Sequence, residues 1–136
     1  MGFRLRSHPA DVAVEAEGTT FGDAAAAAAD GMAAAMCESV PAGGERVRVE
    51  VTAESRSALL FEYLTELILQ RDIRSVLPVD NTATVSSTDT GYRLEGDTRG
   101  VPLDRVNARD LKAVTYSEMS IEETGDGWRV YVVFDV

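Results

Sequence analysis

The chain has 136 residues, of which 45% are apolar and 26% charged, and its formal net charge is −10. This length and balance predict one globular domain over residues 1–136, and no apolar run is long enough to predict a transmembrane helix. Binding driven by phosphate contacts requires basic surface, so the negative charge predicts little direct contact with nucleic acid.

The other composition signals concern location and rare residues. The first residues lack the apolar stretch of a signal peptide, which predicts a cytoplasmic protein. Cys37 is the only cysteine, so an internal disulfide and a cysteine-based zinc cluster are excluded. Of the thirteen basic residues, only Lys112 is a lysine, and this acid-rich, lysine-poor balance is typical of a halophile or a GC-rich genome. Because an ammonium group differs from a guanidinium fork, Lys112 is a candidate for a role that arginine could not fill, with chance as the alternative.

In chain order, the hydrophobic pattern predicts two helices among short strands. The expected elements are strands at 3–6 and 12–17, a helix at 21–37, a strand at 46–51, a helix at 57–71, and strands at 82–87, 92–98, 112–116, 119–123 and 128–135. Glycine-containing turns predict hairpins at 89–91 and 125–127, and Pro9, between the first two strands, predicts a turn or a strand edge. The pattern indicates an α+β fold, with two helices packed on an antiparallel or mixed β-sheet.

The two predicted helices differ in composition. The first follows Thr20, a typical N-cap with Asp23 in the first turn, and consists mainly of alanine. Alanine favours helix and permits close approach of neighbouring backbones, so we expect a tightly packed helix. The second helix carries an apolar stripe that includes Leu60, Leu64 and Leu67 and is unusually broad. This breadth predicts that the second helix lies between two layers or at an interface.

Carboxylates provide most of the candidate chemistry. His8 is the only histidine, and the chain contains no phosphate-binding loop, HExxH motif or GxSxG motif. Asp11 begins the alternating stretch "DVAVEAEG", and Asp135 interrupts the apolar end "VVFDV". If the first and last strands meet, these two acids could bind a hard divalent cation, with a third oxygen from Glu118, a backbone carbonyl or the terminal carboxylate of Val136. The alternative is a turn aspartate and a solvated acid near the chain end.

A second cluster of polar groups lies in the stretch "LKAVTYSE". It places an ammonium, a phenol and a carboxylate within seven residues. If the stretch is extended, Lys112, Val114, Tyr116 and Glu118 lie on one face and form a polar surface for a partner. The alternative is a solvated edge strand.

Four segments follow one another over nearly the whole chain: "HPADVAVEAEG", "LLFEYLTELI", "LKAVTYSEMSIE" and "GWRVYVVFDV". Together they resemble the archease family, whose members activate the RtcB-type tRNA-splicing RNA ligase. Each is weakly specific alone, whereas their order is strongly specific. The resemblance implies an archease-like fold and a cytoplasmic protein that is not itself an enzyme. It also implies a ligase partner that uses GTP to join RNA ends bearing a 2′,3′-cyclic phosphate or 3′-phosphate. The resemblance implies that the protein promotes the guanylylation of this ligase and its multiple turnover.

The resemblance also implies site residues. The family's acidic metal site corresponds to Asp11 and Asp135, and its cation is usually calcium, with magnesium or manganese as alternatives. The family's functional lysine and glutamate correspond to Lys112 and Glu118. Some members modulate or act as chaperones for a tRNA cytosine methyltransferase, which gives a second candidate function.

The chain departs from the family pattern near these residues. Pro9 stands where many relatives have threonine, and Ser117 stands where many have histidine. We therefore carry over no role for His8. A third candidate function is a small metal-dependent hydrolase built on His8, Asp11 and Asp135, and the lack of a clear general base counts against it.

Overall fold

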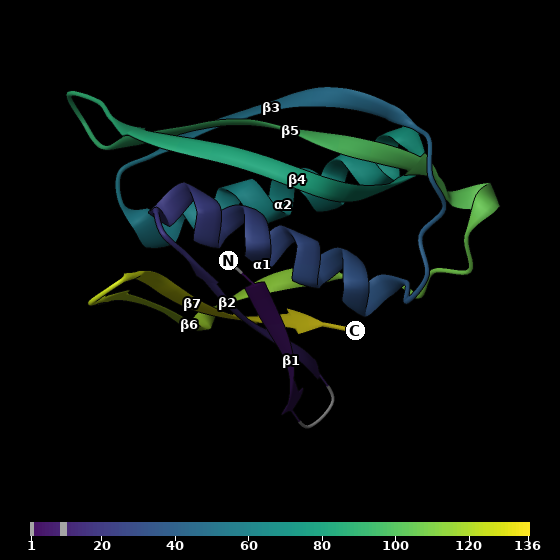
Figure 1. Cartoon of the computed structure of the whole chain (residues 1–136), viewed down its shortest axis with the longest axis horizontal. Coiled ribbons are helices and arrows are strands. Elements are labelled where there is room, and N and C mark those ends of the chain that lie inside the picture. The colour runs from purple at the N-terminus through teal and green to yellow at the C-terminus, as the bar shows by residue number, and fades with distance from the viewer. Residues whose placement is uncertain (1, 9–10) are drawn as a thin grey trace.

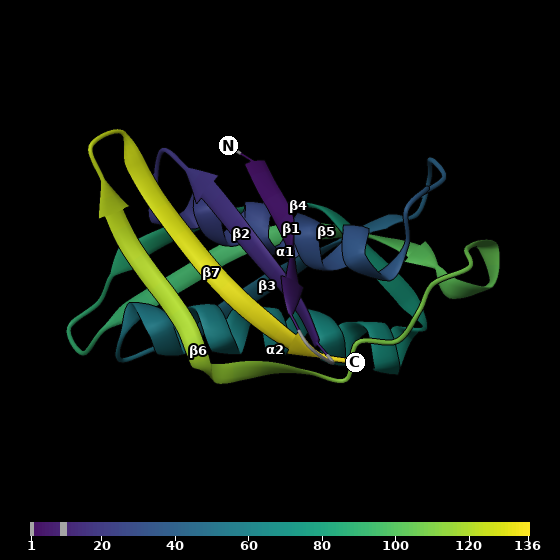
Figure 2. The same ribbon diagram turned by 90° about the horizontal axis from the view of Figure 1, so that it is seen from below.

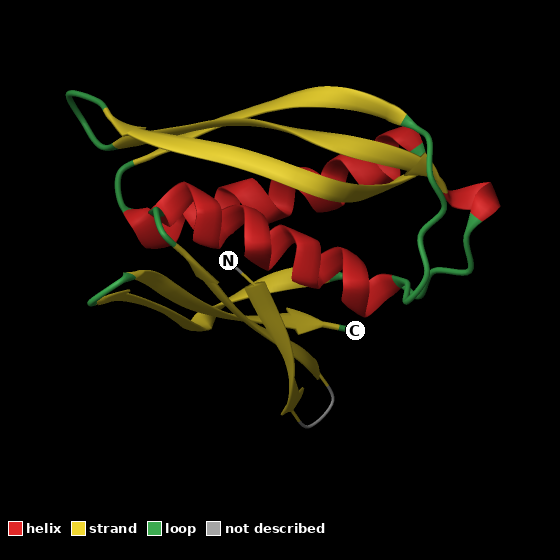
Figure 3. Cartoon of the chain, in the orientation of Figure 1, coloured by secondary structure: helices red, strands yellow, loops and turns green. Residues whose placement is uncertain are grey.

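The computed structural model describes residues 2–8 and 11–136, with the backbone alone at residues 6–8 and 11, and its elements form three layers. Both helices lie between two β-sheets (Figures 1 and 3). The four-stranded sheet has the order β1-β2-β7-β6, and the three-stranded sheet has the order β3-β5-β4. The elements are β1 (Gly2–His8), β2 (Asp11–Gly18), α1 (Phe21–Met36), β3 (Glu45–Ala53), α2 (Arg56–Arg74), β4 (Val76–Ser87), β5 (Tyr92–Pro102), the 3₁₀ turn η1 (Leu103–Arg105), β6 (Ala113–Thr124) and β7 (Gly127–Asp135).

The four-stranded sheet joins the two ends of the chain. β2 is antiparallel to β1 on one side and to β7 on the other, and β7 is also antiparallel to β6. Figure 2 shows these strands side by side on one face of the molecule. The described strand pairs of both sheets are antiparallel, which confirms the predicted α+β class. β2, which begins at Asp11, therefore meets β7, the last strand of the chain, as the metal-site prediction required.

α1 is buried on nearly all sides because it contacts a sheet above and a sheet below. It packs against β2 of the four-stranded sheet and β4 of the three-stranded sheet. Small side chains let both sheets approach: a methyl group added at Gly31 would come within 2.5 Å of Val14 Cγ1. The predicted N-cap is confirmed, since the Thr20 hydroxyl accepts a hydrogen bond from the Asp23 backbone N–H at 3.0 Å. The alanine run is thus a core helix between two layers.

α2 also lies between the sheets, as its broad apolar stripe predicted. It packs against β3 and β6, and Leu60, Leu64 and Leu67 are fully buried. Its outward face exposes Leu69 and Ile73 to solvent. Within the described part of the chain, no helix is long and apolar enough to cross a membrane.

β4 and β6 are longer than the strands that the sequence predicted, because a bulge in each interrupts the alternation of side chains by which a strand is identified. β4 contains Pro78, which pairs in register with Gly100 of β5. Proline is tolerated there because β4 is an edge strand of its sheet. The register then shifts between Val79 and Thr82, and Asp80 adopts a φ of 49°. This bulge interrupts the alternation of apolar and polar side chains by which a strand is identified from sequence, so the sequence of residues 76–81 is typical of a loop.

β6 is one strand with a wide bulge rather than two separate strands. Its regular pairing with β7 runs as far as Thr115 and resumes at Ser120. Residues 116–119 lie in the bulge between these two paired parts. Alternation of side chains between the two faces of the sheet therefore does not continue through the stretch that carries the predicted polar cluster.

Candidate functional site

The candidate site lies where β2 begins and β7 ends. Asp11 and Asp135 are directly opposite each other in the antiparallel β2–β7 pair. Opposite residues in such a pair have Cα atoms about 4.5–5.5 Å apart. Only the backbone of Asp11 is described, and its register places it beside Asp135 although the two lie at opposite ends of the sequence.

His8 is the last residue of β1 and is the register partner of Asp11 across the β1–β2 hairpin. The His8 side chain and residues 9–10, which include the predicted turn at Pro9, lie outside the described part of the structure. The hairpin thus brings the backbones of His8, Asp11 and Asp135 to one end of the four-stranded sheet.

Asp135 accepts hydrogen bonds from two residues at the start of β6: Lys112, just before the strand, and Thr115, within it. Its carbonyl oxygen accepts a hydrogen bond from the Lys112 backbone N–H at 2.8 Å. Its carboxylate Oδ1 accepts one from the Thr115 hydroxyl at 3.4 Å. Asp135 and Val136 are both exposed. The carboxylate therefore lies at the surface on a backbone held by two neighbouring strands.

The structure brings Lys112 to this site but not the whole predicted polar face. Lys112 is exposed and directly precedes β6, whereas Val114 is only 7% exposed and belongs to the core. The Tyr116 ring packs on the Phe61 ring of α2, with centroids 5.2 Å apart. Glu118 is exposed and lies in the bulge of β6. The prediction of one polar face shared by Lys112, Val114, Tyr116 and Glu118 is therefore wrong, because β6 is not regularly extended.

The donor atoms at this strand end fit a hard divalent cation. Carboxylate, hydroxyl and carbonyl oxygens are the ligands that calcium and magnesium prefer. Among the side chains that the structure describes, no three histidine, cysteine, aspartate or glutamate residues gather into a metal site. The Asp11 side chain lies outside that set. The assignment of Asp11, Asp135 and Val136 as metal ligands therefore stays a prediction.

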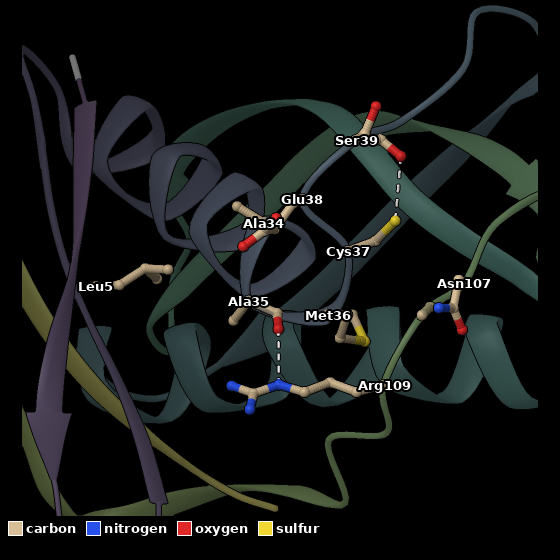
Figure 4. Close-up of a pocket in the computed structure, with 10 residues that line it drawn as sticks. Leu5, Ala34, Ala35, Met36, Cys37, Glu38, Ser39, Asn107 and Arg109 are labelled. Atoms are coloured by element: carbon tan, nitrogen blue, oxygen red, sulfur yellow. Dashed lines mark hydrogen bonds between the residues drawn. The ribbon is translucent and has the colours of Figure 1, made fainter.

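A groove of about 670 Å³ lies beside the same end of the molecule, at the C-terminal end of α1 (Figure 4). α1 has no basic residue in its last turn, and Arg109 supplies the missing cation from a distant part of the chain. The Arg109 Nε donates to the Ala35 carbonyl at 2.9 Å, and its backbone N–H donates to the Met36 carbonyl at 2.8 Å. Cys37, directly after α1, is buried and lines this groove.

Arg71 is the residue near the site that the sequence analysis missed. Its side chain is 8% exposed and forms an ion pair with Asp110, with Nη2 3.0 Å from Oδ1. A signal was present in the sequence, since Arg71 follows Leu60, Leu64 and Leu67 at helical spacing and continues their stripe. A basic residue at a core position of a helix indicates a buried ion pair, because an unpaired buried charge is very unfavourable.

Two helices between two antiparallel sheets, with β2 paired to the last strand, β7, at an acidic strand end, define a small α+β protein. The chain belongs to the archease family: it matches the Archease protein family (MTH1598/TM1083) over residues 3–136.

Individual relatives agree with this family assignment. The chain is 33% identical to the protein archease of Thermococcus gammatolerans over 134 residues, which cover 95% of this chain and 94% of the relative. It is 31% identical to the protein archease of Thermococcus kodakarensis over the same length, with the same two shares covered.

Two solved structures have the same fold. The solution structure of protein 1598 from Methanobacterium thermoautotrophicum has a TM-score of 0.87 and 27% identity, with 99% of each chain covered. The crystal structure of an archease and possible chaperone from Thermotoga maritima has a TM-score of 0.66 and 20% identity, with 98% of this chain and 96% of that chain covered. The second likeness shows the fold alone.

Proposed function

We propose that this protein acts in the cytoplasm as a non-enzymatic activator of an RtcB-type RNA ligase, with a divalent cation bound where the two ends of the chain meet. The observation that carries the proposal is the hydrogen bond from the Lys112 N–H to the Asp135 carbonyl, together with the Asp11–Asp135 register. The sole lysine and the candidate cation site then belong to one exposed strand end. Membership of the archease family supports the choice of partner.

The proposed cation ligands are Asp11, Asp135 and the terminal carboxylate of Val136. Two acidic residues directly opposite each other in a sheet repel, and a bound cation would offset this repulsion. All the proposed donors are oxygen, which suits calcium, magnesium and manganese alike, and calcium is the first candidate because the family resemblance implies it. When bound, the cation would supply positive charge at the strand end, while the paired strands β2 and β7 would hold its ligands.

Lys112 and Glu118 are the proposed contacts to the ligase. A lysine ammonium is a compact charge on a flexible stem, which suits contact with a phosphate or a carboxylate in the partner's nucleotide pocket. Glu118 in the bulge of β6 offers an acceptor for a donor or metal of the partner. In this mechanism the ligase performs the chemistry, and the archease chain favours the guanylylated state through contacts alone.

The test is multiple-turnover ligation by the cognate ligase on RNA with 2′,3′-cyclic phosphate and 5′-hydroxyl ends. We expect the wild-type chain to raise the number of turnovers, and Asp135→Ala and Lys112→Ala to lose most of this effect. Asp126→Ala and Arg48→Ala are matched controls, because both residues are exposed and neither is placed at the site. If Asp135→Ala and Lys112→Ala both stimulate like the wild type, the proposal is wrong.

A second candidate function is that of a chaperone or modulator of a tRNA cytosine methyltransferase. The family resemblance suggests this candidate, and the structural relative from Thermotoga maritima is itself named as a possible chaperone. This candidate predicts that the chain shifts the site preference of a methyltransferase and leaves the ligase unaffected. The hydrolase alternative predicts cleavage of phosphodiesters by the purified chain with Mg²⁺ or Mn²⁺, whereas ligase activation predicts none.

A further inference from the structure

We propose that Arg71 is a positioning residue for Lys112: it orients the peptide group that joins Leu111 to Lys112, so that the lysine leaves the core beside Asp135. This inference rests on the proposed role of Lys112 in activating the ligase. It concerns a residue on α2 that is buried and that lies 41 positions before the lysine (112 − 71).

The segment that leads to Lys112 needs external support because it has no regular structure. Residues 107–112 belong to neither a helix nor a strand. The Leu111 side chain is fully buried, whereas Lys112 is exposed, so the chain passes from core to surface within one residue. Without a helix or sheet ladder, the direction of Lys112 depends on how the preceding peptide group is held.

That peptide group is held from both sides. Its carbonyl oxygen, on Leu111, accepts a hydrogen bond from Arg71 Nη1 at 2.8 Å. Its N–H, on Lys112, donates to the Asp135 carbonyl at 2.8 Å. Because a peptide group is planar, these two bonds tie one rigid unit to α2 at one end and to β7 at the other. The orientation of the Lys112 Cα therefore depends directly on Arg71.

The Arg71 guanidinium is itself fixed by two acidic residues. Its Nε donates to Asp72 Oδ1 at 3.0 Å, and its Nη2 lies 2.9 Å from the same oxygen. Nη2 also lies 3.0 Å from Asp110 Oδ1, on the segment that it supports. One planar fork thus joins a carboxylate on its own helix, a carboxylate on residue 110 and the Leu111 carbonyl. A lysine ammonium lacks the fork geometry to reach all three groups.

The experiment uses Arg71→Lys, which keeps the charge and removes the fork. Amide hydrogen exchange of the full chain, measured by NMR, reports on the Lys112 N–H, because that N–H is the donor to Asp135. We expect this amide to exchange about tenfold faster in Arg71→Lys than in the wild type, while amides of the α2 core keep their rates. Arg93→Lys is the matched control, because Arg93 also pairs with two carboxylates, those of Glu50 and Glu95, but lies on the three-stranded sheet.

Ligation at saturating amounts of the variant supplies the functional readout. Misplacement of Lys112 lowers the maximal stimulation, whereas a smaller folded fraction is overcome by adding more protein. We expect Arg71→Lys to lose more than half of the maximal stimulation and Arg93→Lys to lose none. Unchanged Lys112 exchange, or full maximal stimulation by Arg71→Lys, would overturn the inference.

Asp110→Asn decides the question if Arg71→Lys does not fold. The Asp110 side chain is 72% exposed, so its substitution removes one support of Arg71 without opening the core. The same faster exchange at Lys112 is expected, by a few fold, and its absence overturns the inference.

The exchange measurement needs no ligase. If the wild-type chain fails to stimulate the ligase while Lys112 exchange changes as expected, the proposed function has failed and the positioning of Lys112 by Arg71 stands.

Discussion

The two ends of the three-layer structure are closed in different ways. At the end where both helices begin (Figure 1), an aromatic cluster joins the two sheets. The Arg56 guanidinium lies 4.8 Å from the ring centroid of Tyr92, on the three-stranded sheet, and 4.7 Å from that of Trp128, on the four-stranded sheet. Trp128 also meets Phe21 of α1 edge-on, at 5.5 Å between ring centroids. We call these four residues the aromatic clamp.

The opposite end, where both helices finish, is closed by arginine hydrogen bonds to backbone. Arg109 binds carbonyls at the end of α1, and Arg71 of α2 binds the Leu111 carbonyl. Apolar and cation–π contacts of the clamp tolerate small shifts, whereas hydrogen bonds to a peptide group set its orientation. We infer from this difference that one end serves stability, while the other, in the proposal made above, also sets the direction of the exposed Lys112 side chain. Four changes, from the largest expected effect to the smallest, test this difference.

The largest expected effect is on the clamp. Trp128→Ala removes the ring that contacts both Arg56 and Phe21, and we expect it to lower the free energy of unfolding by about 3 kcal/mol. Urea denaturation measures this loss. Below the unfolding transition, maximal stimulation of the ligase should equal that of the wild type, because the clamp lies at the far end of β7. A selective loss of stimulation in folded Trp128→Ala would contradict the separation of the two ends.

Cation binding tests the site end directly. A ligand that binds only the folded state stabilises it by about 2.7 kcal/mol at a concentration one hundred times its Kd. We expect calcium to raise the Tm of the wild-type chain and a chelator to reverse the rise. Asp135→Asn should abolish the shift, whereas Asp126→Asn, in the β6–β7 turn, should keep it. Equal shifts in both variants would exclude a cation at the strand end.

Arg109→Ala is expected to have a smaller effect on stability. It removes the cation and the side-chain donor at the end of α1, which costs about 1 kcal/mol. Hydrogen exchange should become faster at residues 107–109 and stay unchanged at the clamp residues. The measurement is exchange together with urea denaturation. Faster exchange at Trp128 would mean that the two ends of the molecule are coupled.

The smallest expected effect concerns Asp30, in the part of α1 between the two ends. Burial raises the pKa of the Asp30 carboxyl above its usual value, and nearby Asp80 adds to the rise, although Asn81 donates two hydrogen bonds to this carboxylate. A carboxyl with a raised pKa in the folded state favours folding when protonated, so its contribution to stability falls as the pH rises through that pKa.

Asp30→Asn removes this titration and leaves the other acids in place. Compared with the variant, the wild-type chain should lose stability as the pH rises from the ordinary pKa of an aspartate carboxyl through the raised pKa of Asp30. Urea denaturation across this range measures the difference. A wild-type chain that gains stability relative to Asp30→Asn over the same range would show that the hydrogen bonds from Asn81 outweigh burial.

Much of this protein was predictable from patterns between near neighbours in the sequence. Helical spacing and the Thr20 cap predicted α1, and the breadth of the apolar stripe of α2 predicted its place between layers. Turn residues predicted the hairpins that follow β4 and β6. The bulges of β4 and β6 were missed, because one or more extra residues shift the alternation that identifies a strand.

The sequence by itself thus determined the helices, most strands, the α+β class and, through four ordered segments, the archease resemblance. Only the tertiary structure decided which distant residues meet: Asp11 with Asp135 in the β2–β7 register, and Arg71 with the peptide group before Lys112. Local structure depends on hydrogen bonds and periodicity within a few residues. Strand register and a buried guanidinium depend instead on how both sheets pack on both helices, so they follow from the complete core.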